Sequence, residues 1–268
     1  FSTHAEDIFR TLPADVTIAE LGAGTASKTG ILLRALTRHQ PHVLYQPIDI
    51  SPSALDEARE SLEASIPGIA VQPKVANYIT DPVVLHRPPN TRILALYIGS
   101  SIGNFSPAEA RAILSNLRAQ LSPGDALLLG TDLAPSRSKP VATLLAAYND
   151  TAGTTAAFNR NILYRLNRDL DASFQPRCFA HRAIWNPTHS RIEMHLESLI
   201  SQTIHIPESP AAPSLTLHLA PGESIHTENS YKFSFASIAS LLTAARFTST
   251  RTFTDSENLF AVTLASAT

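Results

Sequence analysis

Between residues 16 and 133, short apolar runs alternate with amphipathic segments, and this alternation constrains the fold more than any other feature. Strands are predicted at 16–21, 42–50, 69–76, 91–98 and 124–133. Helices are predicted between them at 28–38, 51–65 and 106–121. Strands and helices that follow one another in this way form an α/β fold, a parallel sheet with helices on both faces. The run 91–98 is almost entirely apolar, which predicts a central strand.

After residue 138 the pattern changes. Helices are predicted at 140–150 and 154–170, followed by β-rich segments at 178–185, 191–200, 202–206 and 214–220. A helix at 235–247 and a hairpin at 249–266 then return to the first pattern, and the hairpin is expected to complete the main sheet. We therefore predict a domain made of 1–138 and 233–268, interrupted by an inserted domain, 139–232, that has its own antiparallel sheet.

Composition limits the classes of function. The chain has 268 residues, of which 44% are hydrophobic and 16% charged, enough apolar material for a sizeable core. A net charge of -2 disfavours nucleic acid as a partner. No apolar run reaches membrane-spanning length, and the charged opening FSTHAEDIF is unlike a signal peptide. The one cysteine, Cys178, suits a reducing compartment, so we expect a cytoplasmic protein. We also expect a monomer.

A glycine turn follows the first predicted strand. Gly22 and Gly24 allow the backbone to turn sharply and to approach a ligand closely. The third glycine of a dinucleotide fingerprint is missing, since Ser27 stands there, and no phosphate-binding GK[ST] follows. Glu20, placed just before the turn, gives the motif I pattern of S-adenosylmethionine-dependent methyltransferases. A tight turn that binds no ligand remains the alternative.

Three polar positions follow the next strands. Asp49 ends the second strand, 27 residues after Gly22, where a carboxylate can accept both ribose hydroxyls. Its alternative role is a helix N-cap, although Ser51 already fits that role. After the third strand, Asn77 could bond the adenine edge and Tyr78 could stack on its face. A loop amide and a core aromatic are the structural alternatives.

The loop 99–107, GSSIGNFSP, follows the fourth strand. In this class of fold it would face the methyl group and its acceptor. Asn104 offers two donors and one acceptor in a loop kept open by Gly99 and Gly103. An ordinary turn asparagine is the alternative.

Seven motifs occur in order along the chain: ELGAGTASKT, GSSIGNFSP, LLLGTDL, AAYND, TAAFNRNILYRLNRDL, RIEMHLES and GESIHTENSYKF. Together they resemble the histidine Nα-methyltransferases of ergothioneine biosynthesis, from about residue 3 to about 264. The resemblance implies a Rossmann-like class I methyltransferase sheet with an inserted α+β substrate-binding domain. It also implies S-adenosyl-L-methionine as cofactor and L-histidine as substrate, methylated on its α-amino group up to the trimethylated betaine, hercynine.

The resemblance also implies site residues. The cofactor would lie against Gly22, Gly24, Lys28, Asp49, Asn77 and Tyr78. The substrate would be bound by Gly99, Asn104, Tyr148, Glu228 and Ser230. Among these, Asn104 and Tyr148 would take the α-carboxylate, and Gly99 would lie near the amine. Glu228 and Ser230 would take the imidazole; two residues apart in a strand, they can share a face.

The chain departs from the family in two places. Asn77 replaces an aspartate, and the lost charge assistance is worth on the order of 1 kcal/mol. The family also has a segment ahead of Phe1 whose tyrosines close over both ligands. Either the sequence here begins past that segment, or this relative has a different lid.

Other site features are less defined. No residue is marked as a general base, so the catalytic residues are unknown. The ten histidines form no HExxH and Cys178 has no CxxC partner, so no metal site is expected. Two alternatives to histidine methylation stay open: another amino acid as acceptor, or a relative that binds the cofactor without catalysis.

Overall fold

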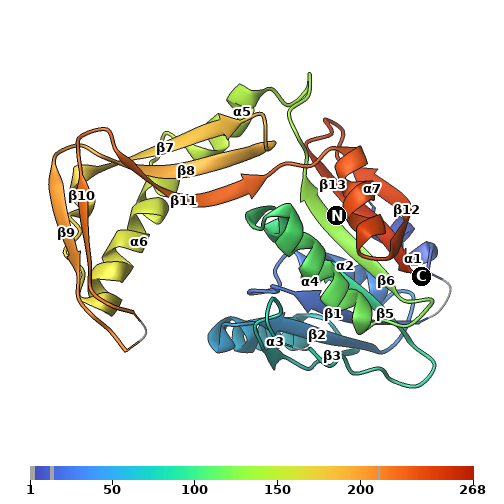
Figure 1. Ribbon diagram of the computed structural model, residues 1–268. Coiled ribbons are helices and arrows are strands. Elements are labelled where there is room, and N and C mark those ends of the chain that lie inside the picture. Colours follow the sequence, from blue (N-terminus) through green and yellow to red (C-terminus); the bar gives the residue numbers. More distant parts are fainter. Residues whose placement is uncertain (1–3, 13–14, 82, 211) are drawn as a thin grey trace. The chain divides into compact units, whose positions relative to one another are not determined.

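The computed structural model describes residues 4–12, 15–81, 83–210 and 212–268 (Figure 1). The chain divides into two compact units. The first comprises the chain up to Leu133 together with Phe233–Thr268, and the second is Ala134–Lys232. The predicted inserted domain, 139–232, lies within the second unit, and its role as a substrate-binding domain stays a prediction.

The first unit is built on one sheet of eight strands in the order β12-β13-β6-β5-β1-β2-β3, with β4 also paired to β2. Its strands are β1 Val16–Leu21, β2 Val43–Asp49, β3 Ile69–Val71, β4 Lys74–Val75, β5 Arg92–Tyr97, β6 Ala126–Asp132, β12 Phe247–Thr254 and β13 Phe260–Ala267. The pairs from β6 to β3 are parallel, whereas β13 and β12 form an antiparallel hairpin at the β6 edge. The predicted α/β fold, its central strand and its closing hairpin are confirmed.

One predicted strand of this unit is wrong in extent. Residues 69–76 form the two short strands β3 and β4, both paired with β2. Pro73, which lies between them, has no N–H to donate to the ladder, so a continuous strand is disfavoured there.

Helices cover the sheet. They are α1 Ala5–Arg10, α2 Thr29–Leu36, α3 Pro52–Ser65, the 3-10 helix η1 Ser101–Asn104, α4 Pro107–Ala119 and α7 Phe235–Ala244. Ser51 caps α3 by accepting a hydrogen bond from the Ala54 N–H at 3.3 Å. Ser106 begins α4 with a capping box that includes Glu109. The helix α1 was not among the predicted elements.

The core lies on both faces of the sheet. Along β5, Leu94 and Leu96 belong to one buried cluster and Ile93 and Ala95 to the other. A strand buried on both faces explains the nearly unbroken apolar run in the sequence. Among the described residues, the helices are too short or too polar to cross a membrane.

The second unit has two sheets, so the single antiparallel sheet predicted for it is wrong. Its elements are α5 Val141–Tyr148, α6 Thr154–Leu170, the 3-10 helix η2 Pro176–Cys178, β7 Phe179–Asn186, β8 Arg191–Ser198, β9 Gln202–Ile206, β10 Leu215–Leu219 and β11 Ser224–Tyr231. Three strands pair antiparallel in the order β11-β8-β7, and β9 and β10 form a separate hairpin. Strand β8 alternates buried and half-buried residues, so one face of the larger sheet is covered and the other is more open.

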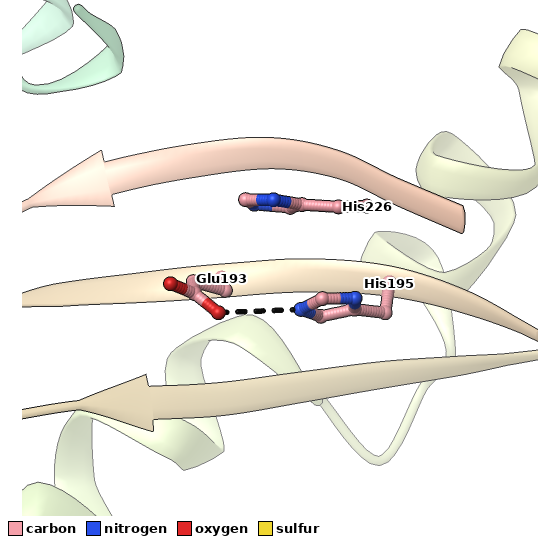
Figure 2. Close-up of side chains that lie close together, drawn as sticks. All are labelled: Glu193, His195 and His226. Carbon is pink, nitrogen blue, oxygen red and sulfur yellow. Dashed lines mark hydrogen bonds and ion pairs between the residues drawn. The ribbon is translucent and has the colours of Figure 1, made fainter. Parts of the chain in front are cut away.

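A β-bulge in β11 decides which face each of its residues joins. His226 pairs with His195, but Glu228 pairs with Met194, because the register shifts between His226 and Glu228. His195 and Met194 are neighbours on β8 and therefore point to opposite faces. His226 and Glu228, although two residues apart, consequently point to opposite faces as well. Figure 2 shows His195 and His226 together on the more open face.

Candidate functional site

The glycine turn after β1 has the backbone conformation that its sequence predicts. Gly22 has φ of +67° and Gly24 has φ of +51°, both in the left-handed region that favours glycine. The Gly22 N–H donates to the carbonyl of Ile48 at 2.9 Å, which ties the turn to the end of β2. No heavy atom lies within 4 Å of the position a Cβ would take on Gly24. The turn therefore leaves open space beside its backbone.

Asp49, at the end of β2, holds this turn. Its Oδ2 accepts from the Gly24 N–H at 2.9 Å, and its Oδ1 accepts from the Ser51 N–H at 3.0 Å. A carboxylate has about four acceptor positions, so each oxygen keeps one for a ligand hydroxyl. The structure thus brings Asp49 and Gly24 into direct contact. The N-cap of α3 is Ser51, so Asp49 does not have the N-cap role considered as its alternative.

Tyr78 and Asn77 lie near the same edge. A Cβ on Gly22 would be 3.3 Å from the Tyr78 hydroxyl, so this ring lies against the turn. Its centroid is 5.7 Å from that of Tyr97, with the rings edge to face. The Oδ1 of Asn77 accepts from the Ile79 N–H at 3.1 Å. Both side chains therefore have structural contacts, and their adenine contacts stay predictions.

Gly99, Asn104 and Lys28 are exposed. Gly99 follows β5, and no heavy atom lies within 4 Å of the position its Cβ would take. Asn104 ends η1, and Lys28 directly precedes α2. Because β2, β1 and β5 are parallel neighbours, the segments that follow them leave the sheet at the same edge. Gly22, Gly99 and the end of β2 are therefore grouped there.

Glu20 is buried beneath this edge, and the sequence did not reveal its partners. The Tyr45 hydroxyl donates to its carboxyl at 2.5 Å, and the Thr29 hydroxyl lies 2.7 and 2.8 Å from its two oxygens. Burial raises the pKa of Glu20 to about 7, although these hydrogen bonds act in the opposite direction. The side chain joins β1 to β2 and to α2. Its role here is structural.

The second unit brings Tyr148 and Ser230 together with Lys232. The Tyr148 hydroxyl lies 2.7 Å from the Ser230 hydroxyl. The Lys232 ammonium donates to both, at 2.7 Å to Tyr148 and 2.9 Å to Ser230, and lies 4.6 Å from the centroid of the Tyr148 ring. Ser230 and Lys232 are buried. Lys232 was not among the predicted site residues, although residues 228, 230 and 232 alternate.

A count of protons in this trio shows what it offers to a ligand. Lys232 can only donate, so both hydroxyl oxygens act as acceptors toward it. Tyr148 and Ser230 have two hydroxyl protons, and the bond between them uses one. The second proton belongs to the hydroxyl that accepts in this bond, and it points away from the pair. The trio thus presents one outward hydroxyl donor next to a cation, which suits an anionic or lone-pair-bearing ligand.

Glu228 lies on the same face of the sheet as Ser230, since their partners Met194 and Ile192 alternate on β8. Its side chain is half-buried, and burial raises its pKa, while the positive charge of Lys232 acts to lower it. Within the described part of the chain, its carboxylate accepts no hydrogen bond. The apolar residues of this face include Met194, opposite Glu228, and Ile192. A carboxylate in these surroundings favours a ligand that brings an N–H.

Two further residues fix Tyr148 in place, and the sequence reasoning missed both. His181 Nε2 donates to the carbonyl oxygen of Tyr148 at 2.8 Å. Asn159 Nδ2 donates to His181 Nδ1 at 3.0 Å and to the carbonyl oxygen of His195 at 3.2 Å. These bonds define the tautomer of His181 and link the end of α5 to α6 and β7.

The chain is similar to known proteins along almost its whole length. A family model for histidine-specific, S-adenosylmethionine-dependent methyltransferases matches residues 1–267. The histidine N-alpha-methyltransferase of Mycolicibacterium smegmatis is 37% identical over 264 residues, covering 98% of this chain and 78% of the relative. Ergothioneine biosynthesis protein 1 of Neurospora crassa is 30% identical over 166 residues, covering 61% of this chain and 18% of the relative.

A solved structure is similar in fold. The CcbJ methyltransferase from Streptomyces caelestis superposes with a TM-score of 0.50 at 13% identity, covering 100% of this chain and 95% of that one. At this level of identity the likeness concerns the fold alone. It confirms the methyltransferase fold that the sequence motifs predicted.

Proposed function

The chain belongs to the histidine-specific, S-adenosylmethionine-dependent methyltransferase family, and from this premise we propose that it methylates the α-amino group of L-histidine. Repeated transfer leads to the trimethylated betaine, hercynine, a step of ergothioneine biosynthesis. The observation that carries the proposal is a cluster of four side chains. Glu228 and Ser230 lie on one face of the three-stranded sheet, and Tyr148 from the end of α5 and Lys232, just after β11, bond to Ser230. We expect the protein to act as a monomer in the cytoplasm.

The residues after β1 and β2 fit S-adenosylmethionine. Asp49 keeps acceptor positions for two ribose hydroxyls while it holds the glycine turn. The open space beside Gly24 admits a ligand that a side chain would block. We assign Gly22, Tyr78 and Asn77 to the same ligand, together with Lys28. The cofactor supplies a methyl group already activated on a sulfonium, so the chain has mainly to position the two reactants.

The second unit offers complementary groups for histidine. We assign the imidazole to Glu228, which accepts from a ring N–H, and to Ser230, which bonds the other ring nitrogen. Tyr148 is assigned to the α-carboxylate, and the nearby Lys232 ammonium favours that negative charge. As the family resemblance implies, Asn104 is assigned to the carboxylate and Gly99 to the surroundings of the amine. Fixing both ends of histidine restricts the position of its amine.

Mass spectrometry tests the proposal directly. The protein is incubated with L-histidine and S-adenosylmethionine, and products with one, two and three added methyl groups are expected. Leucine and tryptophan serve as competing acceptors in the same assay. Cofactor binding without any methylated product would support a non-catalytic relative. Methylation of another amino acid in preference to histidine would support the other alternative.

A further inference from the structure

A carboxylate and two imidazoles meet on the face of the three-stranded sheet opposite Glu228. Glu193 and His195 alternate on β8, so both point to this face. His226, on β11, lies directly across from His195. Figure 2 shows the three side chains together, and their ligand atoms all lie within 4.8 Å of one another. No motif in the sequence indicated this group, since His226 is 31 residues beyond His195.

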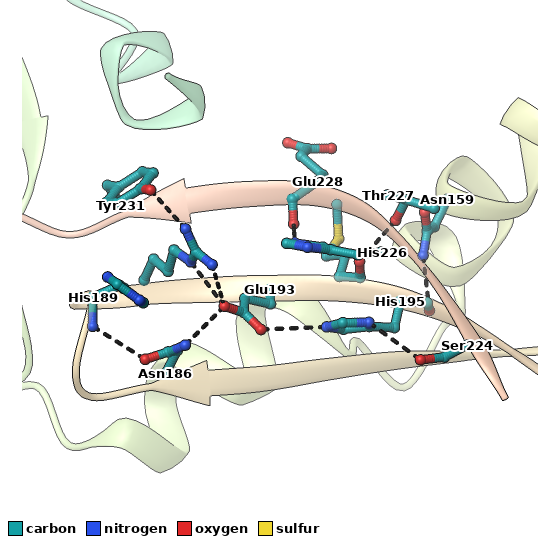
Figure 3. Close-up of polar contacts among 12 residues, drawn as sticks. Asn159, Asn186, His189, Glu193, His195, Ser224, His226, Thr227, Glu228 and Tyr231 are labelled. Carbon is teal, nitrogen blue, oxygen red and sulfur yellow. Dashed lines mark hydrogen bonds and ion pairs between the residues drawn. The ribbon is translucent and has the colours of Figure 1, made fainter. Parts of the chain in front are cut away.

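The Glu193 carboxylate is oriented by its neighbours (Figure 3). Its Oε1 accepts from Arg191 at 2.6 and 2.8 Å and from Asn186 at 2.8 Å. Its Oε2 faces Nε2 of His195 at 3.4 Å. One carboxylate oxygen of Glu193 is therefore held by Arg191 and Asn186, and the other is directed at an imidazole.

Each of the two imidazoles also has a hydrogen-bond partner outside this group of three side chains. His226 Nε2 lies 3.1 Å from the carbonyl oxygen of Glu228, which can only accept, so Nε2 carries the proton and Nδ1 keeps its lone pair. His195 Nδ1 lies 3.5 Å from the Ser224 hydroxyl, at the opposite side of the ring from Glu193. The rings stack with centroids 4.7 Å apart. In metal-binding histidines, a hydrogen bond at the ring nitrogen that does not bind the metal sets the tautomer.

We propose that Glu193, His195 and His226 bind a divalent transition-metal ion of the Zn²⁺ type. Two imidazole nitrogens and one carboxylate oxygen suit zinc, cobalt, nickel and copper, whereas magnesium and calcium prefer oxygen ligands alone. Ligand atoms around tetrahedral zinc lie roughly 3.4 Å apart, so small side-chain rotations bring these three into range. His226 is exposed and gives the ion access, and water completes the coordination. This proposal does not depend on the proposed function.

Calorimetric titration of the full, tag-free chain with ZnCl₂ tests the site. One ion per chain is expected, and titration with CoCl₂ should give the visible absorption bands of low-coordinate cobalt. His226→Gln removes one ligand at an exposed position, so its fold should persist, as circular dichroism can verify. Removing a hydrogen-bond partner of a metal ligand weakens metal binding about 10–100-fold. Removing the His226 ligand itself should weaken zinc binding at least as much. Glu193→Gln should weaken it too, and His195→Ala/His226→Ala should abolish it.

The matched control is His205→Ala/His218→Ala. This variant also removes two imidazoles, from the separate β9–β10 hairpin. It should bind one zinc ion with unchanged affinity. The proposal is overturned if the wild-type chain binds no ion, if the folded His226→Gln variant binds as tightly as wild type, or if the control loses the ion equally.

Discussion

Burial raises the pKa of two glutamates, one in each unit, but their surroundings differ. Glu20 in the first unit is enclosed, and the hydroxyls of Tyr45 and Thr29 contact its carboxyl. Glu228 in the second unit is half-buried, and its carboxylate has no hydrogen-bond donor among the described residues. The same direction of pKa shift thus has two meanings. A carboxyl with its partners in place holds the fold, whereas one lacking them is suited to receive a ligand.

The largest effect is expected from Glu228→Ala. Removing one partner of a buried, charged hydrogen bond costs about 4 kcal/mol, so kcat/KM for histidine should fall about 1,000-fold. The pocket should also admit bulkier rings such as indole. Competition assays with histidine, tryptophan and leucine measure both effects, and Glu208→Ala, an exposed glutamate of the same unit, is the control. An unchanged preference would make Glu228 a surface charge and remove the contrast with Glu20.

Glu20→Gln should change stability rather than substrate choice. The folded pKa of Glu20, about 7, exceeds the ordinary value of 4.5. Between these values the unfolded chain releases the proton while the folded chain keeps it, so this group makes stability fall as pH rises. The free energy of unfolding should fall by on the order of 3 kcal/mol between pH 4.5 and 7. This fall should be absent in Glu20→Gln.

Urea denaturation at several pH values from 4.5 to 8 measures this difference between wild type and variant. Glu60→Gln, an exposed glutamate on α3, should leave the wild-type profile unchanged. If Glu20→Gln shows the same pH dependence as wild type, Glu20 is not the group that releases a proton in this window.

Asp49→Ala tests the proposed cofactor site of the first unit. Loss of charge-assisted hydrogen bonds to the ribose should weaken S-adenosylmethionine binding by about 1–3 kcal/mol. Calorimetry with the methyl donor and its demethylated product measures this, with NAD and ATP as ligands that should not bind. Because Asp49 also holds the Gly24 N–H, Asp49→Asn separates charge from support of the turn. If the wild-type chain shows no heat of binding with either S-adenosylmethionine or its demethylated product, the proposed cofactor site is wrong.

The smallest effects are expected from Tyr148→Phe and Asn104→Ala. Each removes one polar contact to the substrate carboxylate, which should raise the free energy of the transition state by about 1–2 kcal/mol. The value of kcat/KM for histidine should therefore fall about 5–30-fold. Cofactor affinity should stay nearly constant in both variants. Tyr164→Phe, an exposed tyrosine on α6, is the matched control for the hydroxyl. Equal losses of cofactor and histidine affinity in either variant would show that the assigned roles are wrong.

Local signals carried most of the first unit. Ser51 and Ser106 each precede a proline and cap a helix at the expected residue, because capping depends on neighbours within one turn. The glycine turn and the central strand also follow from short windows. The second unit was predicted less completely: β7 to β10 were predicted as separate strands, whereas β11 was not among the predicted elements. The division of the strands into two sheets depends on pairing between distant segments.

The sequence by itself determined the order of strands and helices, the glycine turn with Asp49 after the next strand, and the family. These properties depend on local backbone preferences and on apolar periodicity. Only the tertiary structure joined Lys232 to Tyr148, which lies 84 residues away, and His226 to His195. It also introduced the bulge that places His226 and Glu228 on opposite faces, where regular alternation predicts one face. Strand register and bulges arise from contacts between distant segments, so no short stretch of sequence specifies them.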